Sequence, residues 1–301
     1  MSRASRRGFL GAALATALEP PAGAAGANIQ WGLGIVTWTS KSSPGQLRWE
    51  QILADIQAGG FDGVEPFTQR VLPINDESMA ELERLAPKHN VRVASIYWGD
   101  QFHLRSEQER IRKECPRFLG YLKRLKSDRL TIGPPRPDVE DEKAAVLSMA
   151  GMMNEIGRMA LNEGIKTGVH PHVGGLIENP RQIDLLMRNT DPKYFNLSPD
   201  TAQLWMGGGE VVEMFEKYKH RIVYIHYKDI RAYHRGLKNY MDNVIELGRG
   251  ILDFPALHRI LKGIRYKGWI TIDLDNARIS PLESAKVQRE YIDKVLKPIY
   301  A

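Results

Sequence analysis

The amino-acid sequence predicts a closed (β/α)8 barrel, the TIM-barrel fold, and two observations lead to it. Short runs rich in Val, Ile and aromatic residues, bounded by Gly, Pro or Asp, predict eight strands, at residues 31–36, 63–65, 92–97, 129–132, 166–170, 194–197, 222–226 and 269–274. Stretches with helical spacing of apolar residues predict eight helices between them, at residues 46–58, 77–89, 107–125, 140–162, 180–188, 210–218, 254–262 and 281–296. Such alternation, without a long linker, is typical of a closed parallel barrel.

Residues at the element boundaries support this assignment. Asn90, Gly164 and Gly268 each stand just before a predicted strand, where a residue that tolerates the left-handed region ends the preceding helix. In the helix at 140–162, helical spacing is shown by Leu147, Met152, Ile156, Met159 and Ala160. No change of composition marks a domain boundary, so residues 28–301 are predicted to form a single barrel domain.

An open, doubly wound sheet is the main alternative fold. It requires a Gly-rich phosphate turn directly after its first strand. Here Gly32 and Gly34 lie inside that strand, and the third glycine of the motif is missing. The 301 residues would accommodate either two small domains or one barrel. The order of elements therefore decides in favour of the barrel.

Composition and charge indicate an ordinary globular protein. The chain is 43% hydrophobic and 26% charged, with a formal net charge of +6. The basic residues are spread through helical stretches such as 105–126 and are mixed with acids, which is typical of a solvated helix surface and argues against nucleic-acid binding. The single cysteine, Cys115, excludes an internal disulfide and a multi-cysteine metal site, and we expect a buried structural thiol.

The first 27 residues are typical of a signal peptide. Residues 5–10 read Ser-Arg-Arg-Gly-Phe-Leu, a twin-arginine export pattern, and a weakly apolar run follows at 11–18. Ala25-Gly26-Ala27 then matches a small-residue cleavage site. We therefore expect a periplasmic or secreted protein. The apolar run is too short to span a bilayer, so no membrane partner is expected after cleavage.

Polar residues gather where the predicted strands end. The second strand closes with Glu65, the fifth with His170-Pro171-His172, and the sixth runs into Asp200. The seventh strand closes with His226, and the eighth with Asp273 and Asp275. Parallel strands bring their carboxyl ends to one mouth, and imidazole and carboxylate ligands suit Mn, Fe, Co or Zn. The sequence therefore predicts a divalent metal site at the mouth.

Each of these residues also has a structural interpretation. A single histidine on a strand is commonly a hydrogen-bonded core residue. Asp200 is placed to cap the helix that follows it, and Asp273 or Asp275 to cap the last loop. The metal interpretation is favoured because four independent strand ends carry suitable ligands on the same side of the barrel.

Several segments resemble one known family. They read Gly-Phe-Asp-Gly-Val-Glu at 60–65, Ser-Pro-Asp-Thr-Ala-Gln at 198–203, Ile-His-Tyr-Lys-Asp at 225–229, Leu-Gly-Arg-Gly-Ile-Leu-Asp-Phe at 247–254 and Gly-Trp-Ile-Thr-Ile-Asp at 268–273. In this order they resemble the xylose isomerase-like barrels, often called sugar phosphate isomerases/epimerases, from about residue 31 to 296. The branch that contains myo-inosose dehydratase is the most similar one. The resemblance implies a metal-dependent enzyme with a TIM-barrel fold.

The resemblance also implies which side chains bind the metal. Many members use Glu, Asp, His and Glu from four strand ends, and these positions correspond here to His170, Asp200, His226 and Asp273. His170 stands where glutamate is usual, and Asp273 is one methylene shorter than the usual glutamate. His170 and His172 lie on the same strand face, so either one is a candidate ligand, with His170 preferred. Among Mn, Co, Fe and Zn, the preferred ion is Mn.

The chemistry implied by the family begins with removal of a proton beside a carbonyl, which a divalent cation promotes by stabilising the enediolate. A histidine at position 170 argues against the two-glutamate epimerase mechanism and leaves isomerisation or dehydration. His172, Asp273 and Glu246 are candidate bases, and Lys228 is a candidate acid or oxyanion partner. A structural pair between Lys228 and Asp229 is the alternative for these two residues.

Other residues are candidates for substrate binding. Glu65 lies at the predicted mouth, where it would bind sugar hydroxyls, and Gln203 stands where many relatives have a substrate-contacting histidine. Trp38, Tyr97 and Trp205 follow strand ends and offer flat faces for a sugar ring. Packing beneath a loop is the structural alternative for each of these aromatic residues.

The leading functional hypothesis is thus a metal-dependent isomerase, epimerase or lyase acting on a small sugar or inositol. Export favours an unphosphorylated keto-sugar, keto-inositol or oxidised glycoside, and Gly207-Gly208-Gly209 lacks the Lys and Ser/Thr of a phosphate loop. A non-catalytic exported sugar-binding barrel is the second hypothesis. An abasic-site nuclease is a remote third, because it requires more His and Glu ligands. A homo-oligomer is compatible with the fold.

Overall fold

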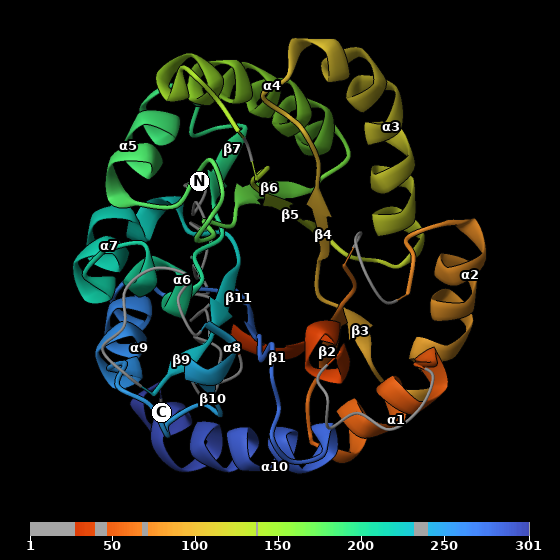
Figure 1. The fold of residues 1–301 in the computed structure, drawn as a ribbon. Helices are drawn as coiled ribbons and strands as arrows, with labels where there is room; N and C mark the ends of the chain where they lie inside the picture. The colour runs from red at the N-terminus through yellow and green to blue at the C-terminus, as the bar shows by residue number, and fades with distance from the viewer. Residues whose placement is uncertain (1–27, 40–46, 68–71, 137, 232–239, 301) are drawn as a thin grey trace, which may run out of the picture.

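The computed structural model describes residues 28–39, 47–67, 72–136, 138–231 and 240–300, and it confirms a barrel of strands surrounded by helices (Figure 1). The strands are β1 (Ile29–Gly34), β2 (Gly63–Glu65), β3 (Arg92–Val93), β4 (Ile96–Gly99), β5 (Arg129–Gly133), β6 (Lys166–Val169), β7 (Phe195–Leu197), β8 (Ile225–Tyr227), β9 (Asp229–Ile230), β10 (Val244–Ile245) and β11 (Gly268–Ile272). The α-helices are α1 (Trp49–Ala58), α2 (Asp76–Leu85), α3 (Arg105–Arg124), α4 (Glu142–Asn162), α5 (Pro180–Arg188), α6 (Thr201–Met206), α7 (Val211–Tyr218), α8 (Tyr240–Asn243), α9 (Phe254–Gly263), α10 (Pro281–Tyr291) and α11 (Lys297–Tyr300).

Two parallel sheets together form the barrel wall. One has the order β3-β2-β1-β11-β8 and the other the order β4-β5-β6-β7. Three isolated bridges join them, Phe67 with Tyr97 on one side, and Leu197 with Ile222 and Asp200 with His226 on the other. Because these strands run parallel around the ring, their carboxyl ends open at one mouth.

Local capping signals explain where several helices begin. The Asp141 side chain caps α4 by accepting a hydrogen bond from the first turn. Asn179 with Gln182, and Ser280 with Glu283, form complete capping boxes at the starts of α5 and α10, and a proline follows each cap at the first helical position. These residues specify the helix starts from the local sequence alone.

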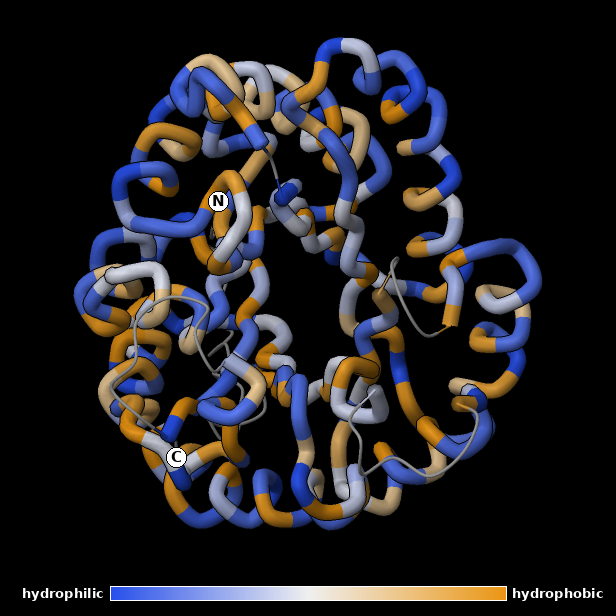
Figure 2. The backbone as a smooth tube through the Cα atoms, viewed as in Figure 1, coloured by the Kyte–Doolittle hydropathy of each residue, from blue (hydrophilic) through white to orange (hydrophobic). Residues whose placement is uncertain are grey.

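Apolar residues recur along the helices between hydrophilic ones, as expected for helices that cover a barrel (Figure 2). The core they form is continuous, and Trp31 on β1 and Trp49 on α1 are among its largest buried side chains. Cys115 on α3 lies in the same core, and burial raises the pKa of its thiol to about 12. The prediction of a buried structural thiol is therefore confirmed.

Two predicted strands differ from the observed ones. The run at 92–97 forms two strands, since β3 pairs with β2 while β4 pairs with β5, and residues 94 and 95 change partners between the sheets. The run at 31–36 ends as a strand at Gly34, and a 3-10 helix follows at Ile35–Thr39. The first difference occurs where the strand passes from one sheet to the other, and the second where a 3-10 helix replaces the strand. Residue preferences alone do not reveal either change.

The structure also contains elements that the sequence patterns did not predict. β9 and β10 form an antiparallel two-stranded sheet, and α6, α8 and α11 are too short to show a helical period. The predicted helix at 281–296 is present, but its last turn is a π-helix at Ile292–Leu296.

Two predicted features fall on residues that the structure does not describe. They are the signal peptide at 1–27 and the first residue of the helix predicted at 46–58. Within the ranges that the structure describes, none of the helices combines the length and apolar character needed to cross a membrane.

Candidate metal centre

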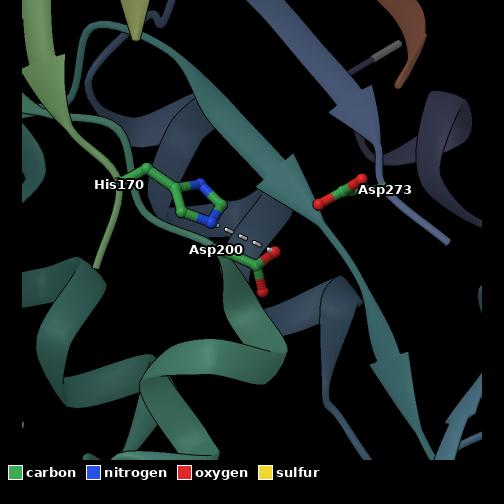
Figure 3. A group of neighbouring side chains, drawn as sticks. All are labelled: His170, Asp200 and Asp273. Atoms are coloured by element: carbon green, nitrogen blue, oxygen red, sulfur yellow. Dashed lines mark ion pairs between the residues drawn. The ribbon is translucent and has the colours of Figure 1, made fainter. Parts of the chain in front are cut away.

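Three buried acceptor side chains converge at the mouth of the barrel. His170 follows β6, Asp200 follows β7 and Asp273 follows β11, and one potential ligand atom from each lies within 4.8 Å of the others. His170 and Asp200 approach most directly, with Nε2 and Oδ2 separated by 4.0 Å (Figure 3). The structure therefore brings together three of the four residues predicted as metal ligands.

The backbone holds each of these side chains in place. The N–H of His170 donates to the carbonyl of Ile132 on β5, and the N–H of Asp273 donates to that of Tyr227 on β8. Asp200 caps α6, because its Oδ1 accepts from the Gln203 N–H at 2.9 Å. The capping interpretation of Asp200 is thus confirmed, and it is compatible with metal binding because it uses only one of the two carboxylate oxygens.

Lys228 lies among the carboxylates of this mouth. Its Nζ is 2.8 Å from Asp273 Oδ2, 2.6 Å from Asp275 Oδ2 and 3.2 Å from Asp200 Oδ2. Burial disfavours the charged ammonium, but the three carboxylates outweigh burial and hold the Lys228 pKa well above its ordinary value. Three carboxylates and one ammonium leave an excess of two negative charges in a buried space.

The residues fit a divalent cation. Asp200 Oδ2 and Asp273 Oδ1 are among the buried side-chain atoms that have no hydrogen-bond partner in the described part of the chain, although Lys228 forms an ion pair with Asp200 Oδ2. Unpartnered buried carboxylate oxygens are costly unless another group compensates them. Burial raises the pKa of Asp273 to about 6, with Lys228 opposing this shift. One imidazole and two carboxylates match the ligand preferences of Mn, Fe, Co and Zn.

His226, the fourth predicted ligand, lies beside the cluster. Its Nδ1 is 2.9 Å from Nδ1 of His170, and its Nε2 is 2.5 Å from Oε2 of Glu65. Burial opposes protonation of His226, but the Glu65 carboxylate outweighs it and raises the His226 pKa. The His170 pKa is well below its ordinary value because of burial and the neighbouring His226. Glu65 therefore contacts a histidine, whereas the sequence predicted contacts with substrate hydroxyls.

A cavity of about 380 Å³ opens onto this cluster, and His170, Lys228 and Asp273 form part of its wall. Tyr97 and Phe67 line the same cavity, with their rings stacked at a centroid distance of 4.3 Å. His172 also lines it. Tyr97, His172 and Lys228 thus lie where the sequence analysis placed them, beside the candidate metal ligands.

Two glycines at strand ends leave room for side chains of the site. A Cβ on Gly133, at the end of β5, would lie 2.2 Å from the Tyr97 hydroxyl oxygen. A Cβ on Gly34, at the end of β1, would lie 2.9 Å from Asp273 Oδ1. Glycine at these two strand ends therefore lets the Tyr97 ring and the Asp273 carboxylate occupy the mouth.

Besides Glu65, Asp200 and His226, four predicted site residues lie outside the cavity wall. Glu246 accepts a hydrogen bond from Ser284 of α10 at 2.9 Å, and Trp38 donates from Nε1 to Asp55 at 2.9 Å. Trp205 is buried on α6. The packing alternative describes the two tryptophans better than a sugar-stacking role does, and Glu246 is turned towards a helix. Neighbouring helices supply these partners, which local sequence does not show.

The fourth of these residues, Gln203, connects loops around the site. Its Oε1 accepts from the Val173 N–H at 3.0 Å, and its Nε2 donates to the Tyr240 hydroxyl oxygen at 2.9 Å. Tyr240 also accepts from Lys228 Nζ at 2.9 Å and donates to Asp275. Tyr240 belongs to the short helix α8 and was not predicted, because no motif marks it and only the tertiary fold brings it to Lys228.

Lys228 and Asp229 do not form the structural pair considered as an alternative. Asp229 starts β9, and its carboxylate accepts hydrogen bonds from the backbone N–H groups of Gly248, Gly250 and Leu252, at 3.0, 2.8 and 3.3 Å. It thereby fixes the loop that precedes α9, while Lys228 points to the cluster.

Comparisons with known proteins agree with this architecture. A family model described as xylose isomerase-like TIM barrel matches residues 53–295. The chain is similar to an inosose dehydratase of Bacillus velezensis, with 25% identity over 300 residues that cover 89% of this chain and 97% of the relative.

Two solved structures share the fold. A probable 3-DHS dehydratase of Bacillus anthracis has a TM-score of 0.72 at 12% identity, covering 88% of this chain and 99% of its own. A structure of the IOLI protein with a bound zinc atom also has a TM-score of 0.72, at 17% identity, covering 88% and 97% of the two chains. Because the family model matches residues 53–295, most of its length, the chain belongs to the xylose isomerase-like TIM barrel family.

Proposed function

We propose that the protein is a divalent-metal-dependent enzyme that removes a proton next to a carbonyl group of an unphosphorylated keto-sugar, keto-inositol or oxidised glycoside. The reaction then ends in loss of water or in isomerisation. The observation that carries this proposal is the convergence of His170, Asp200 and Asp273 within 4.8 Å at the barrel mouth. A bound divalent cation, with Mn preferred, would polarise the carbonyl and acidify the neighbouring C–H bond.

His172 is the proposed base. Its Nδ1 lies 2.8 Å from the carbonyl oxygen of Val173, and because a carbonyl oxygen only accepts, Nδ1 carries the proton. Nε2 is then the unprotonated nitrogen, and His172 lines the cavity. Burial and the nearby Lys228 lower the His172 pKa, which keeps the imidazole neutral and able to accept a proton at neutral pH.

Lys228 is the proposed oxyanion partner. Its raised pKa keeps the ammonium protonated, so electrostatic stabilisation of developing negative charge is favoured over proton donation. Tyr240 and Asp275 hold the ammonium in position, and Lys228 Nζ reaches the wall of the cavity. Glu246, the other predicted catalytic residue, has no proposed step because it contacts Ser284.

Three observations support the substrate class. The stacked pair of Phe67 and Tyr97 offers a flat apolar surface for a sugar or inositol ring. The excess of carboxylates around Lys228 disfavours a phosphate dianion. Curated relatives over 89% of the chain are named inosose dehydratase. A histidine at position 170 replaces the glutamate on which two-base epimerisation depends, so dehydration or isomerisation is the favoured outcome.

We also propose export to the periplasm or outside the cell. The support is the twin-arginine pattern at residues 5–10 and the small residues at 25–27. An extracytoplasmic location agrees with an unphosphorylated substrate. Attaching residues 1–27 to a reporter protein, with Arg6→Lys and Arg7→Lys as the control, tests this part of the proposal by cell fractionation.

The enzymatic proposal is tested by metal analysis and hydrogen exchange. Purified protein loaded with Mn or Co is incubated in D2O with scyllo-inosose, 3-keto-glucosides and simple ketoses, and NMR follows deuterium entry beside the carbonyl. We expect about one metal per chain and exchange in one of these substrates. The His172→Gln variant should retain the metal and lose exchange by about 10²–10⁴-fold. Metal without exchange in any substrate would favour a sugar-binding protein, and absence of metal would refute the site.

A further inference from the structure

A hydrogen-bonded chain of three side chains crosses the barrel beneath the cavity. Glu65 at the end of β2 reaches His226 on β8, with 2.5 Å between Oε2 and Nε2. His226 in turn reaches His170 after β6, with 2.9 Å between the two Nδ1 atoms. Glu65 and His226 are both fully buried, and His170 is 1% exposed. Three strands that are distant in sequence therefore meet through polar atoms only.

The chemistry of these groups fixes the position of each proton. An ionised carboxylate only accepts hydrogen bonds, so the proton between Glu65 and His226 belongs to Nε2 of His226. Above the raised pKa of His226 the ring is neutral, and an imidazole protonated at Nε2 then presents a lone pair at Nδ1. The short contact between the two Nδ1 atoms then requires His170 to donate its Nδ1 proton to His226. Glu65 thus determines which atom donates in each hydrogen bond between these three side chains.

The position of Glu65 argues against a role in substrate binding. It is fully buried and is not among the residues that line the cavity, although Phe67, two residues further along the chain, is. Its second oxygen, Oε1, has no hydrogen-bond partner in the part of the chain that is described. Within the described residues, the hydrogen bond of this carboxylate is the one to His226.

We propose that Glu65 is a positioning residue that holds His226 in the Nε2-protonated tautomer, so that Nδ1 of His226 accepts from Nδ1–H of His170 and Nε2 of His170, 4.0 Å from Asp200 Oδ2, stays free for the metal. This inference rests on the proposed metal-dependent function. A partner that accepts the distal N–H of a metal-binding histidine orients the ring and increases its basicity. Here His226, itself held by Glu65, would do this for His170. Removal of such a partner typically weakens metal binding by about 10–100-fold. Glu65 would then affect the reaction only through His226.

The first test reads the tautomer without any metal. Imidazole ¹⁵N NMR of the metal-free full-length chain distinguishes protonated from unprotonated ring nitrogens, and a His226→Gln spectrum assigns the His226 signals. We expect a protonated Nε2 and an unprotonated Nδ1 on His226, with the opposite pattern on His170. Glu65→Gln should shift the His226 signals towards a mixture of tautomers. A wild-type His226 protonated at Nδ1 would overturn the proposal, whether or not the protein binds metal.

The second test measures affinity for Mn²⁺ by isothermal titration calorimetry. Glu65→Gln should weaken binding by about 10–100-fold, and Glu65→Asp, whose carboxylate is retracted by one methylene, should weaken it less than Glu65→Gln. Circular dichroism and thermal unfolding of both variants establish that they fold. The matched control is Glu50→Gln, because Glu50 forms the same kind of pair with His89, at 2.9 Å on the surface. This control should bind Mn²⁺ like the wild type.

The outcomes separate this inference from the proposed function. If wild-type protein binds Mn²⁺ and Glu65→Gln binds it equally well, Glu65 is not a positioning residue. If Glu65→Gln raises KM for a keto substrate while Mn²⁺ affinity and the His226 tautomer are unchanged, Glu65 binds substrate instead. If wild-type protein binds no metal, the proposed function fails, and the tautomer measurement still decides the role of Glu65.

Discussion

The two faces of strand β8 lead to two buried histidines in opposite surroundings. His226 points into the barrel, where Glu65 contacts one ring nitrogen and His170 the other. The next residue, Tyr227, points outward, and its hydroxyl lies 3.0 Å from Nδ1 of His258 on α9. Successive residues of a strand face opposite sides of the sheet. Strand β8 therefore supplies one residue to the barrel mouth and the next to the packing against α9.

The outer histidine has only aromatic neighbours in its ring contacts. Trp31 stacks on His258 at a centroid distance of 5.6 Å, and Tyr300 meets it edge-on at 5.2 Å. Burial lowers the His258 pKa to about 4. At the mouth, by contrast, Glu65 raises the pKa of an equally buried histidine, His226. Burial alone therefore does not determine the charge of a histidine, because an adjacent carboxylate reverses the direction of the shift.

The two regions also differ in how well their polar atoms are satisfied. His258 has the Tyr227 hydroxyl as a partner, whereas Asp273 Oδ1 at the mouth has no hydrogen-bond partner among the described residues, and Asp200 Oδ2 has only the Lys228 ion pair there. Unsatisfied buried carboxylates lower stability, so their presence indicates a binding requirement. The His258 cluster is consistent with a purely structural role. The following predictions test this distinction, beginning with the largest expected effect.

Replacing Lys228 by methionine should have the largest effect on the metal-free protein. The change removes the ammonium from among Asp200, Asp273 and Asp275 and leaves their charges uncompensated. Breaking a buried ion pair in this way costs about 3–5 kcal/mol. Urea unfolding in EDTA measures the loss, and added Mn²⁺ should recover part of it. Equal losses with and without Mn²⁺ would contradict a cation site at this mouth.

Asp200→Asn should abolish metal binding with little loss of fold stability. Asparagine retains the oxygen that caps α6 but lacks the negative charge. Affinity for Mn²⁺ should fall by more than about 100-fold, which exceeds the usual effect of removing a residue that only hydrogen-bonds to a metal ligand. Calorimetric titration measures the affinity, and thermal unfolding without metal should be close to that of wild type. Retained Mn²⁺ affinity would remove Asp200 from the ligand set.

His258 should make stability depend on pH in a predictable direction. Because the folded-state pKa is lowered from 6.5 to about 4, the unfolded chain binds more protons between these values, and stability falls as pH decreases through this range. The contribution between pH 7 and pH 5 is about 2 kcal/mol. Urea unfolding of wild type and His258→Asn, which keeps an acceptor for the Tyr227 hydroxyl, should show a weaker pH dependence in the variant. Identical pH profiles would contradict a buried neutral His258.

Tyr227→Phe should have the smallest effect and should separate the two faces of β8. It removes the hydroxyl that contacts His258, which costs about 1 kcal/mol of folding free energy. Mn²⁺ affinity should stay at the wild-type value, although position 227 lies between His226 and Lys228. A large loss of Mn²⁺ affinity would show that the two regions are coupled through the strand.

Much of the candidate site follows from strand ends that are visible in the sequence. His170, Asp200 and Asp273 each follow an apolar run, and the parallel barrel brings such positions together. Glu65 was placed at the mouth correctly along the chain, but its partner was not predictable. Its contact with His226 spans 161 residues and depends on where the Glu65 side chain points inside the barrel.

The partners of loop residues were also not predictable from the sequence. Glu246 and Gln203 stand in suitable segments, yet Glu246 turns towards Ser284 and Gln203 towards Val173 and Tyr240. A loop has no period that fixes the direction of its side chains, so its partners come from whichever elements pack above it. Tyr240 became part of the Lys228 environment through that packing alone.

The sequence by itself determined the barrel and the strand ends that carry ligands, because hydrophobic periods and capping residues act over short distances. Only the tertiary structure decided which of these side chains meet. It directed Lys228 to three carboxylates and Asp229, its neighbour, to the backbone of the loop at 248–252. Contacts of this kind depend on distances across the barrel, which closure of the sheet sets and no local pattern encodes.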